Sequence, residues 1–253
     1  MNLNSAQIER YARHLMLREI GGPGQSRLLE SEIAIIGAGG LGSPAALYLA
    51  AAGIGRIRLI DDDVVSTSNL QRQILFSTDQ TGQPKTQTGA ERLHALNPDC
   101  EITALPHRLS EDNAQDLIGD AQFVLDGCDN FATRFLVNDF CHDFGRVLVS
   151  GAVGRWIGQV SVYKSGVADE TNAPCYRCLT PDLPETEESC SEIGVAGPLT
   201  GIVGARMAME TIKEIAGAGD SLSGRLWIYD ALSGDSRLVS LKRDPECPTC
   251  GPN

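Results

Sequence analysis

Short apolar runs alternate with longer segments of helical pattern along the first part of the chain. The runs 32–36 and 56–60 are apolar and β-branched, which is typical of buried strands, and the Ala- and Leu-rich segment 41–52 lies between them. A third run at 123–126 precedes another helical segment at 131–144. Strands that alternate with helices predict an α/β fold with a mostly parallel sheet.

The last third of the chain has a different pattern. Apolar runs at 158–163, 225–229 and 237–241 predict later strands that extend the sheet. The segment 165–192 is rich in Pro, Thr and acidic residues and predicts a long loop. The segment 198–216 predicts a long helix, and its charged residues exclude a membrane span.

A glycine-rich loop, GAGGLG at 37–42, connects the first predicted strand to the first predicted helix. Glycines let the backbone approach a phosphate closely, and the helix N-terminus offers free N–H groups and a partial positive charge. Asp61 follows the next strand, about 20 residues beyond the loop, where a carboxylate can accept hydrogen bonds from ribose hydroxyls. This combination predicts a Rossmann-like nucleotide site. The loop by itself does not distinguish ATP from a nicotinamide dinucleotide.

The overall charge of the chain restricts the kinds of anion it binds. The 21 Lys and Arg residues are outnumbered by 33 Asp and Glu residues, which gives a formal net charge of −12. A chain this acidic is not built to bind nucleic acid or an anionic membrane through its net charge. Any site for an anion must therefore be formed by a few local cations.

Two local cations follow Asp61. Arg72 belongs to the polar stretch SNLQRQ at 68–73. A dinucleotide dehydrogenase has no obvious use for this polar stretch, whereas a protein that binds a nucleoside triphosphate can use it to hold the phosphates. Lys85 follows Pro84 in the first turn of a helix that runs to about residue 96. A lysine there opposes the helix dipole, so a phosphate partner would explain its position. An exposed lysine placed by chance is the alternative.

Asp129 follows the strand predicted at 123–126. Ligands in doubly wound sheets bind beyond the carboxyl ends of the strands, so Asp129 can reach the same crevice as Asp61. A carboxylate in that place can hold Mg²⁺ against phosphate oxygens. Capping of the next helix explains Asp129 equally well.

Four of the eight cysteines form two Cys-x-x-Cys pairs, and this spacing predicts a zinc site made by Cys175, Cys178, Cys247 and Cys250. Four thiolates leave no position for water, so the zinc is expected to be structural. Disulfides or a redox pair are the alternatives. Residues 1–18 are charged and lack the apolar core of a signal peptide, which favours a reducing cytoplasm and metal binding.

Cys190 differs from the remaining cysteines. We expect Cys100, Cys128 and Cys141 to be ordinary buried thiols. Cys190 lies instead in a polar segment where a thiol has no core to fill.

Several motifs occur together and in order along nearly the whole chain. They are Arg10-Tyr11-Ala12-Arg13, GAGGLG, SNLQRQ, Gly82-Gln83-Pro84-Lys85, Asp129-Asn130, Ser150-Gly151-Ala152, the two Cys-x-x-Cys pairs and Gly194-Val195-Ala196-Gly197-Pro198. With them the chain resembles the ThiF/MoeB/HesA family of ubiquitin-activating-enzyme-like adenylyltransferases.

The resemblance implies a role for each candidate residue. Gly40 would contact the phosphates, Asp61 the ribose and Asn130 the adenine end, while Asp129 would hold Mg²⁺. Asn69, Arg72 and Lys85 would contact the triphosphate, and Ser68 and Gln73 would also belong to the cofactor-binding residues. Arg13 resembles an arginine finger that reaches the nucleotide of the other subunit in a homodimer. Cys190 occupies the position of a possible sulfur-transfer thiol.

The implied activity is ATP-dependent adenylylation of the C-terminal Gly-Gly carboxylate of a small ubiquitin-fold sulfur-carrier protein, giving an acyl adenylate and pyrophosphate. A ThiS-like carrier of thiamine biosynthesis and a MoaD-like carrier of molybdopterin biosynthesis are equally compatible with the motifs, and a separate sulfur donor would be required. Two alternatives rest on fewer residues. They are an NAD-dependent oxidoreductase that uses the glycine loop and a non-catalytic, zinc-stabilised module that binds a nucleotide or a partner.

The expected organisation is one adenylation domain over residues 1–253. It would comprise N-terminal helices at 1–30, a nucleotide-binding half at 31–150 and a half at 151–253 that binds the carrier and zinc.

Overall fold

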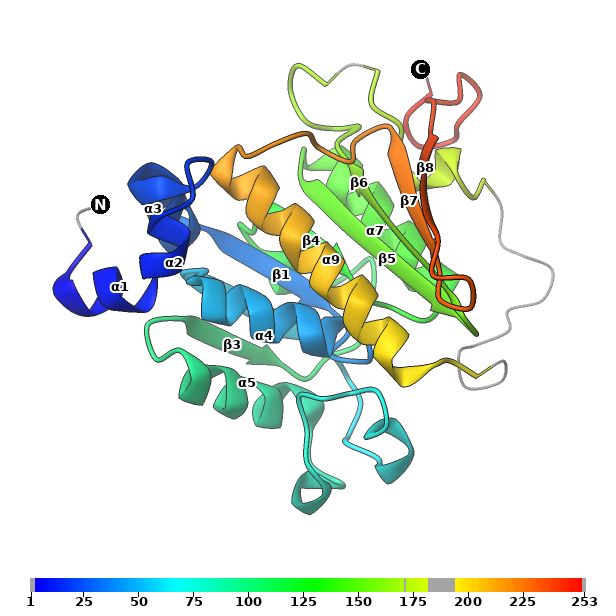
Figure 1. Cartoon of the computed structure of the whole chain (residues 1–253). Helices are drawn as coiled ribbons and strands as arrows, with labels where there is room; N and C mark the ends of the chain where they lie inside the picture. The colour runs from blue at the N-terminus through cyan, green and yellow to red at the C-terminus, as the bar shows by residue number, and fades with distance from the viewer. Residues whose placement is uncertain (1–2, 171, 182–193, 252–253) are drawn as a thin grey trace.

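The computed structural model describes residues 3–170, 172–181 and 194–251, so Cys190 lies outside the described residues. The strands form one sheet in the order β3-β2-β1-β4-β5-β6-β7-β8 (Figure 1). Their bounds are β1 (Glu32–Ile36), β2 (Arg56–Ile60), β3 (Glu101–Leu105), β4 (Phe123–Asp126), β5 (Val147–Gly154), β6 (Ile157–Tyr163), β7 (Arg225–Asp230) and β8 (Ser236–Ser240).

Helices connect these strands and precede the first of them. The α-helices are α1 (Ser5–Arg10), α2 (Ala12–Leu15), α3 (Gly21–Glu30), α4 (Gly42–Ala52), α5 (Lys85–Leu96), α6 (Ala114–Ile118), α7 (Phe131–Asp143) and α9 (Gly197–Ala216). Short 3₁₀ turns are η1 (Thr67–Asn69), η2 (Thr78–Gln80) and η3 (Tyr176–Cys178). None of the helices in the described part of the chain is both long and apolar enough to cross a bilayer.

The predicted α/β class is confirmed. Strands β1 to β5 pair in parallel, and β6, β7 and β8 extend the sheet as antiparallel strands. The sequence analysis did not predict β3, β5 or α6. Strand β3 is a half-exposed edge strand, and β5 has only the short apolar run Val147-Leu148-Val149 before the small residues Ser150-Gly151-Ala152.

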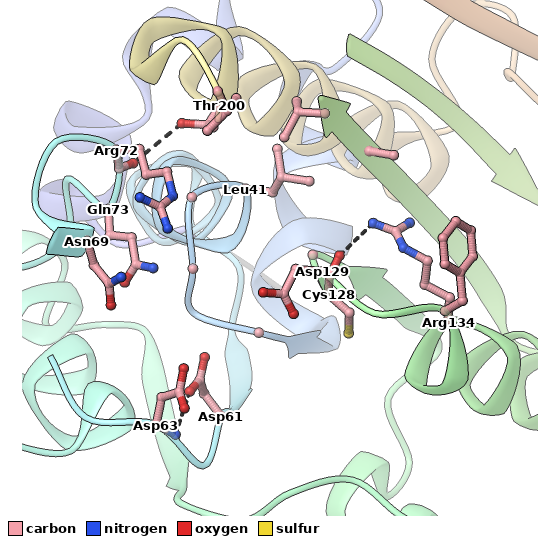
Figure 2. A pocket seen from close by; sticks show the side chains of 18 of the residues that line it. Leu41, Asp61, Asp63, Asn69, Arg72, Gln73, Cys128, Asp129, Arg134 and Thr200 are labelled. Atoms are coloured by element: carbon pink, nitrogen blue, oxygen red, sulfur yellow. Dashed lines mark hydrogen bonds between the residues drawn. The ribbon is translucent and has the colours of Figure 1, made fainter. Parts of the chain in front are cut away.

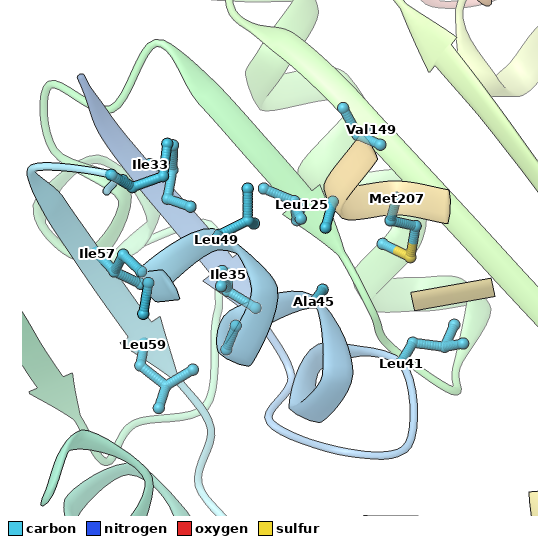
Figure 3. Close-up of a cluster of buried hydrophobic side chains, with 14 of the residues drawn as sticks. Ile33, Ile35, Leu41, Ala45, Leu49, Ile57, Leu59, Leu125, Val149 and Met207 are labelled. Atoms are coloured by element: carbon cyan, nitrogen blue, oxygen red, sulfur yellow. The ribbon is translucent and has the colours of Figure 1, made fainter. Parts of the chain in front are cut away.

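Buried side chains fill the space on both faces of the sheet. On one face, Ile33 and Ile35 of β1 pack with Leu49 of α4 and Met207 of α9 (Figure 3). On the other face, the alternate β1 residues pack with α6 and α7. Successive side chains of a strand point to opposite faces, so a strand buried on both faces must be apolar throughout.

The contact between α4 and α9 is close because of one glycine. A Cβ on Gly204 would lie 2.5 Å from the carbonyl oxygen of Leu41 and from Cγ of Pro44. Only glycine fits there without a shift of the backbone. The close approach brings the start of α9 beside the glycine loop at the carboxyl end of β1 (Figure 1).

Candidate functional site

The glycine loop turns so tightly that two of its positions have no room for a side chain. Gly37 has φ of +89°, and a Cβ on it would lie 3.1 Å from the carbonyl oxygen of Gly127. A Cβ on Gly42 would lie 1.8 Å from the carbonyl oxygen of Gly37. The loop therefore requires glycine at both positions, and it brings bare backbone to the N-terminus of α4, where a phosphate is favoured.

A cavity of about 440 Å³ opens beside this loop (Figure 2). Its walls come from the segments after β2 and β4, from η1 and α5, and from β5, β6 and α9. The predicted residues that line it are Gly40, Asp61, Asn69, Arg72, Gln73, Lys85 and Asp129. The fold thus brings seven dispersed candidates to one cavity, at the carboxyl ends of the parallel strands.

Asp61 is anchored to the glycine loop by backbone groups. Its Oδ2 accepts a hydrogen bond from the Ala38 N–H at 2.7 Å, and its Oδ1 accepts one from the Asp63 N–H at 2.8 Å. Burial raises the pKa of Asp61, and the positive charge of Lys85 and these hydrogen bonds oppose that rise. The carboxylate is held at the cavity edge in a fixed orientation.

Lys85 is buried rather than exposed, so the chance surface lysine considered above is excluded. Its Nζ lies 2.7 Å from Oδ2 of Asp63, and only 4% of its side chain is accessible. The ammonium group faces the cavity. The buried ammonium group thus has Asp63 as one partner, and its place in the cavity lining leaves it able to contact an anionic ligand as well.

The polar stretch at 68–73 supplies a group of side chains on one side of the cavity (Figure 2). Arg72 donates from Nη1 to the Ser68 carbonyl oxygen at 3.2 Å. Gln73 is buried, and its Oε1 has no hydrogen-bond partner among the described residues. The Ser68 hydroxyl instead lies 3.0 Å from the Ser66 hydroxyl, and Ser68 does not line the cavity.

Asp129 and Asn130 have separate roles in the structure. Asn130 caps α7, because its Oδ1 accepts a hydrogen bond from the Thr133 N–H at 2.9 Å, and it does not line the cavity. Asp129 does line the cavity, and within the described residues it makes no hydrogen bond or ion pair. The capping explanation for Asp129 is therefore wrong, and its carboxylate is available to a ligand (Figure 2).

Arg134 lines the cavity although sequence reasoning missed it. Its guanidinium donates to Asp126 Oδ2 at 3.0 Å, to the Cys128 carbonyl oxygen at 2.5 Å and to the Gly151 carbonyl oxygen at 2.9 Å. It also donates to the Ser150 hydroxyl at 3.2 Å. A charged residue on the buried face of the helix predicted at 131–144 was the signal that could have revealed it.

Arg13 lies far from this cavity within one chain. It belongs to α2, and the adjacent Tyr11 accepts a hydrogen bond from Asn97 at the end of α5. Helices α1 to α3 pack at the end of the sheet opposite the glycine loop (Figure 1). Within the part of the chain that the structure describes, the Arg13 side chain donates only to the Met16 sulfur, at 3.8 Å.

The four cysteines of the two Cys-x-x-Cys pairs are brought together from η3 and the C-terminal segment. Their sulfurs all lie within 4.8 Å of one another, and the Cys175–Cys247 and Cys178–Cys250 pairs are each 3.4 Å apart. A tetrahedral site with Zn–S bonds of about 2.3 Å needs sulfurs about 3.8 Å apart, so this set fits zinc. All four are free thiols in this structure, an arrangement that favours metal binding over the disulfide alternative. Cys100, Cys128 and Cys141 are buried, as predicted.

These features describe an α/β protein with a candidate nucleotide cavity and a four-cysteine cluster that can hold a metal ion. The sequence pattern of the ThiF family matches residues 11–249, and the chain belongs to that family. The chain is 42% identical over 253 residues to a sulfur carrier protein adenylyltransferase of Thermus thermophilus, covering 99% of this chain and 93% of that protein. It is 42% identical over 249 residues to the sulfur carrier protein ThiS adenylyltransferase of Escherichia coli, covering 98% and 97%.

The same fold occurs in a more distant solved structure. The crystal structure of Escherichia coli MccB with MccA-N7isoASN superposes with a TM-score of 0.83 at 23% sequence identity. The match covers 96% of this chain and 75% of that chain. At this identity the likeness bears on the fold alone.

Proposed function

We propose that this protein adenylylates the C-terminal carboxylate of a small ubiquitin-fold sulfur-carrier protein that ends in Gly-Gly, using ATP and Mg²⁺. The carrier carboxylate attacks the α-phosphorus of ATP. A carboxylate–phosphate bond forms, and pyrophosphate leaves with the electrons of the broken phosphoanhydride bond. The product is an acyl adenylate that a separate sulfur donor can convert further.

One observation carries this proposal. A single cavity holds Asp61 at one edge, the cations Arg72 and Lys85, and an Asp129 carboxylate that has no partner among the described residues. A nicotinamide dinucleotide would use Gly40 and Asp61 but would leave the cations and Asp129 without a function. A triphosphate uses all of them.

The chain's own residues perform the tasks that this reaction needs. The attacking carboxylate is already ionised at neutral pH, so no general base is required. Repulsion between two anions is the main obstacle, and the guanidinium of Arg72 and the ammonium of Lys85 would neutralise the phosphates. Gly40 packs tightly against α9, since a Cβ there would lie 3.1 Å from the Thr200 Cγ2, and its backbone lines the cavity where the phosphates would bind.

Asp129 is the residue that would hold Mg²⁺. A carboxylate oxygen is a ligand that Mg²⁺ prefers, and no hydrogen bond competes for it among the described residues. Bound Mg²⁺ would supply charge neutralisation on the phosphate oxygens. The four-cysteine centre would hold zinc as a structural ion, in keeping with a reducing cytoplasm.

We also propose that the active form is a homodimer. Arg13 lies at the end of the sheet opposite the cavity of its own chain (Figure 1), so it can reach a nucleotide only in a second copy. A guanidinium supplied by the partner would stabilise charge on the transferring phosphate.

ATP–pyrophosphate exchange tests the proposed reaction. The purified protein is given MgATP and labelled pyrophosphate, with either a ThiS-like or a MoaD-like carrier. Exchange that requires one carrier and its terminal Gly-Gly would establish both the reaction and the pathway. Binding of NADH without binding of ATP would contradict the proposal, and ATP binding without exchange toward either carrier would favour the non-catalytic module.

A further inference from the structure

The two cysteine pairs are attached to the nucleotide cavity by the helix α7, which begins at the Asp129 loop. Asn138 and Asp139 are neighbours on this helix, and each contacts a cysteine turn rather than the cavity. Asn138 Oδ1 accepts a hydrogen bond from the Tyr176 N–H at 2.6 Å. Tyr176 itself stands between the metal ligands Cys175 and Cys178.

Asp139 joins the two cysteine turns to each other. Its Oδ2 accepts a hydrogen bond from Arg177 Nη2 at 2.7 Å, and its Oδ1 accepts one from the Thr249 hydroxyl at 2.6 Å. Arg177 belongs to the first cysteine pair and Thr249 to the second. One carboxylate therefore fixes both halves of the metal centre to α7.

Tyr176, which follows Cys175 in the first cysteine pair, also belongs to the lining of the nucleotide cavity. Tyr176 is only 4% exposed. Its ring packs edge-on against Tyr163 at 5.8 Å between centroids and tilts against Phe135 of α7 at 5.9 Å. The Arg134 guanidinium carbon lies 6.0 Å from the centre of the same ring.

Arg134 completes the connection to the phosphate-binding part of the cavity. It donates to the carbonyl oxygens of Cys128 and Gly151, at 2.5 Å and 2.9 Å. Cys128 is the residue before Asp129. The Tyr176 ring thus lies against the guanidinium that is hydrogen-bonded to the backbone next to Asp129.

We propose that Tyr176 is a positioning residue for the nucleotide site and that the metal centre, held to α7 by Asp139, sets its position. Occupancy of the four-cysteine site is then linked to ATP affinity, although the zinc does not touch ATP. This inference rests on the proposed function only in taking ATP as the ligand.

The first test compares ATP binding with and without the metal in the full-length protein. Zinc is first removed with a chelator, and circular dichroism checks that the sheet and helices persist. Isothermal titration calorimetry then measures the affinity of the metal-free protein for MgATP. We expect removal to weaken ATP binding by about 10-fold or more, the range typical of contacts that orient metal ligands, and Zn²⁺ addition to restore it. Equal affinity of the metal-free and zinc-loaded proteins would overturn the inference.

Substitutions at Tyr176 test whether this residue links the cysteine site to ATP binding while all four cysteines stay in place. Tyr176→Ala removes the ring and should weaken ATP binding by about 10-fold while zinc is released to a chelating indicator at the wild-type rate. Tyr176→Phe keeps the ring and should bind ATP like the wild type. Wild-type ATP affinity in Tyr176→Ala would overturn the inference.

Asp139 and a neighbour on the same helix provide a matched pair. Asp139→Ala should release zinc about 10-fold faster and also weaken ATP binding, because both cysteine turns lose their anchor. Asp143, one turn further along α7, makes no hydrogen bond or ion pair among the described residues, so Asp143→Ala should change neither quantity. Faster zinc release with unchanged ATP affinity in Asp139→Ala would overturn the link. Failure of the wild type to bind ATP would contradict the proposed function instead.

Discussion

The nucleotide cavity and the four-cysteine cluster differ in how their polar side chains are paired. In the cavity, neither Asp129 nor the buried Oε1 of Gln73 has a hydrogen-bond partner among the described residues. Beside the cysteine cluster, Asp139 accepts hydrogen bonds from Arg177, Thr249 and Asn138. A buried polar group without a partner costs about 1–3 kcal/mol, so Gln73 Oε1 is placed for a ligand that supplies the missing contact, whereas the carboxylate of Asp129 is exposed and open to a ligand without that cost.

This difference distinguishes residues that are available to bind a ligand from residues whose hydrogen bonds hold the protein structure together. Arg134 lines the cavity, yet its hydrogen bonds are directed at Asp126, Ser150 and two backbone carbonyl groups. By this criterion we expect Arg134 to maintain the shape of the cavity and Asp129 and Gln73 to contact the ligand. Substitutions at these positions should therefore divide into those that lower stability and those that lower binding or activity.

The largest effect is expected at Arg134. Arg134→Met leaves the buried Asp126 carboxylate without its ion pair, and breaking such a pair costs about 3–5 kcal/mol of unfolding free energy. Equilibrium unfolding in urea measures this loss. Arg72→Met is the control, since Arg72 is less buried and bonds a single carbonyl, and it should change stability by about 0.5 kcal/mol at most. Equal losses of unfolding free energy in Arg134→Met and Arg72→Met would contradict the distinction between structural and ligand-binding residues.

Asp129→Ala is expected to have the next largest effect, on activity alone. Loss of a group that holds Mg²⁺ against the phosphates should reduce pyrophosphate exchange by about 10²–10³-fold, which corresponds to several kcal/mol. The melting temperature should not fall, because the carboxylate has no partner to lose among the described residues. Wild-type exchange by this variant would show that Asp129 is not part of the site.

Gln73→Met should separate binding from stability at a buried position. The substitution removes an oxygen that lacks a partner, so the free energy of unfolding should stay the same or rise by about 1 kcal/mol. ATP affinity should fall by about 10-fold, equivalent to 1.4 kcal/mol. Calorimetric titration and urea unfolding measure the two quantities. A loss of stability with unchanged ATP affinity would show that Gln73 supports the structure and does not contact the ligand.

The smallest effect is expected at Asn130, next to Asp129. Asn130→Ala removes the cap of α7 and should cost about 1 kcal/mol of stability, with exchange by the folded protein unchanged. Urea unfolding and the exchange assay report on these separately. Reduced exchange at wild-type stability would support the adenine contact that the family resemblance implies for Asn130.

The sequence was sufficient for features that depend on neighbours in the chain. The glycine loop, Asp61 after its strand and the Cys-x-x-Cys spacing are local patterns, and the fold places the ends of parallel strands along one edge. Arg134 and Tyr176 could not be assigned in the same way, because their partners lie at distant positions and are partly backbone carbonyl groups. The carbonyl groups of Cys128, after β4, and of Gly151, in β5, come together only when these strands pair, and no residue pattern encodes that.

The most direct test of the central claim is intact mass spectrometry of the carrier after a single turnover. The protein is mixed with MgATP and with either the Gly-Gly carrier or the same carrier lacking its last glycine. The account predicts an AMP adduct on the full-length carrier, equal amounts of pyrophosphate, and neither product with the truncated carrier. Turnover of ATP without an AMP adduct on the carrier would contradict it.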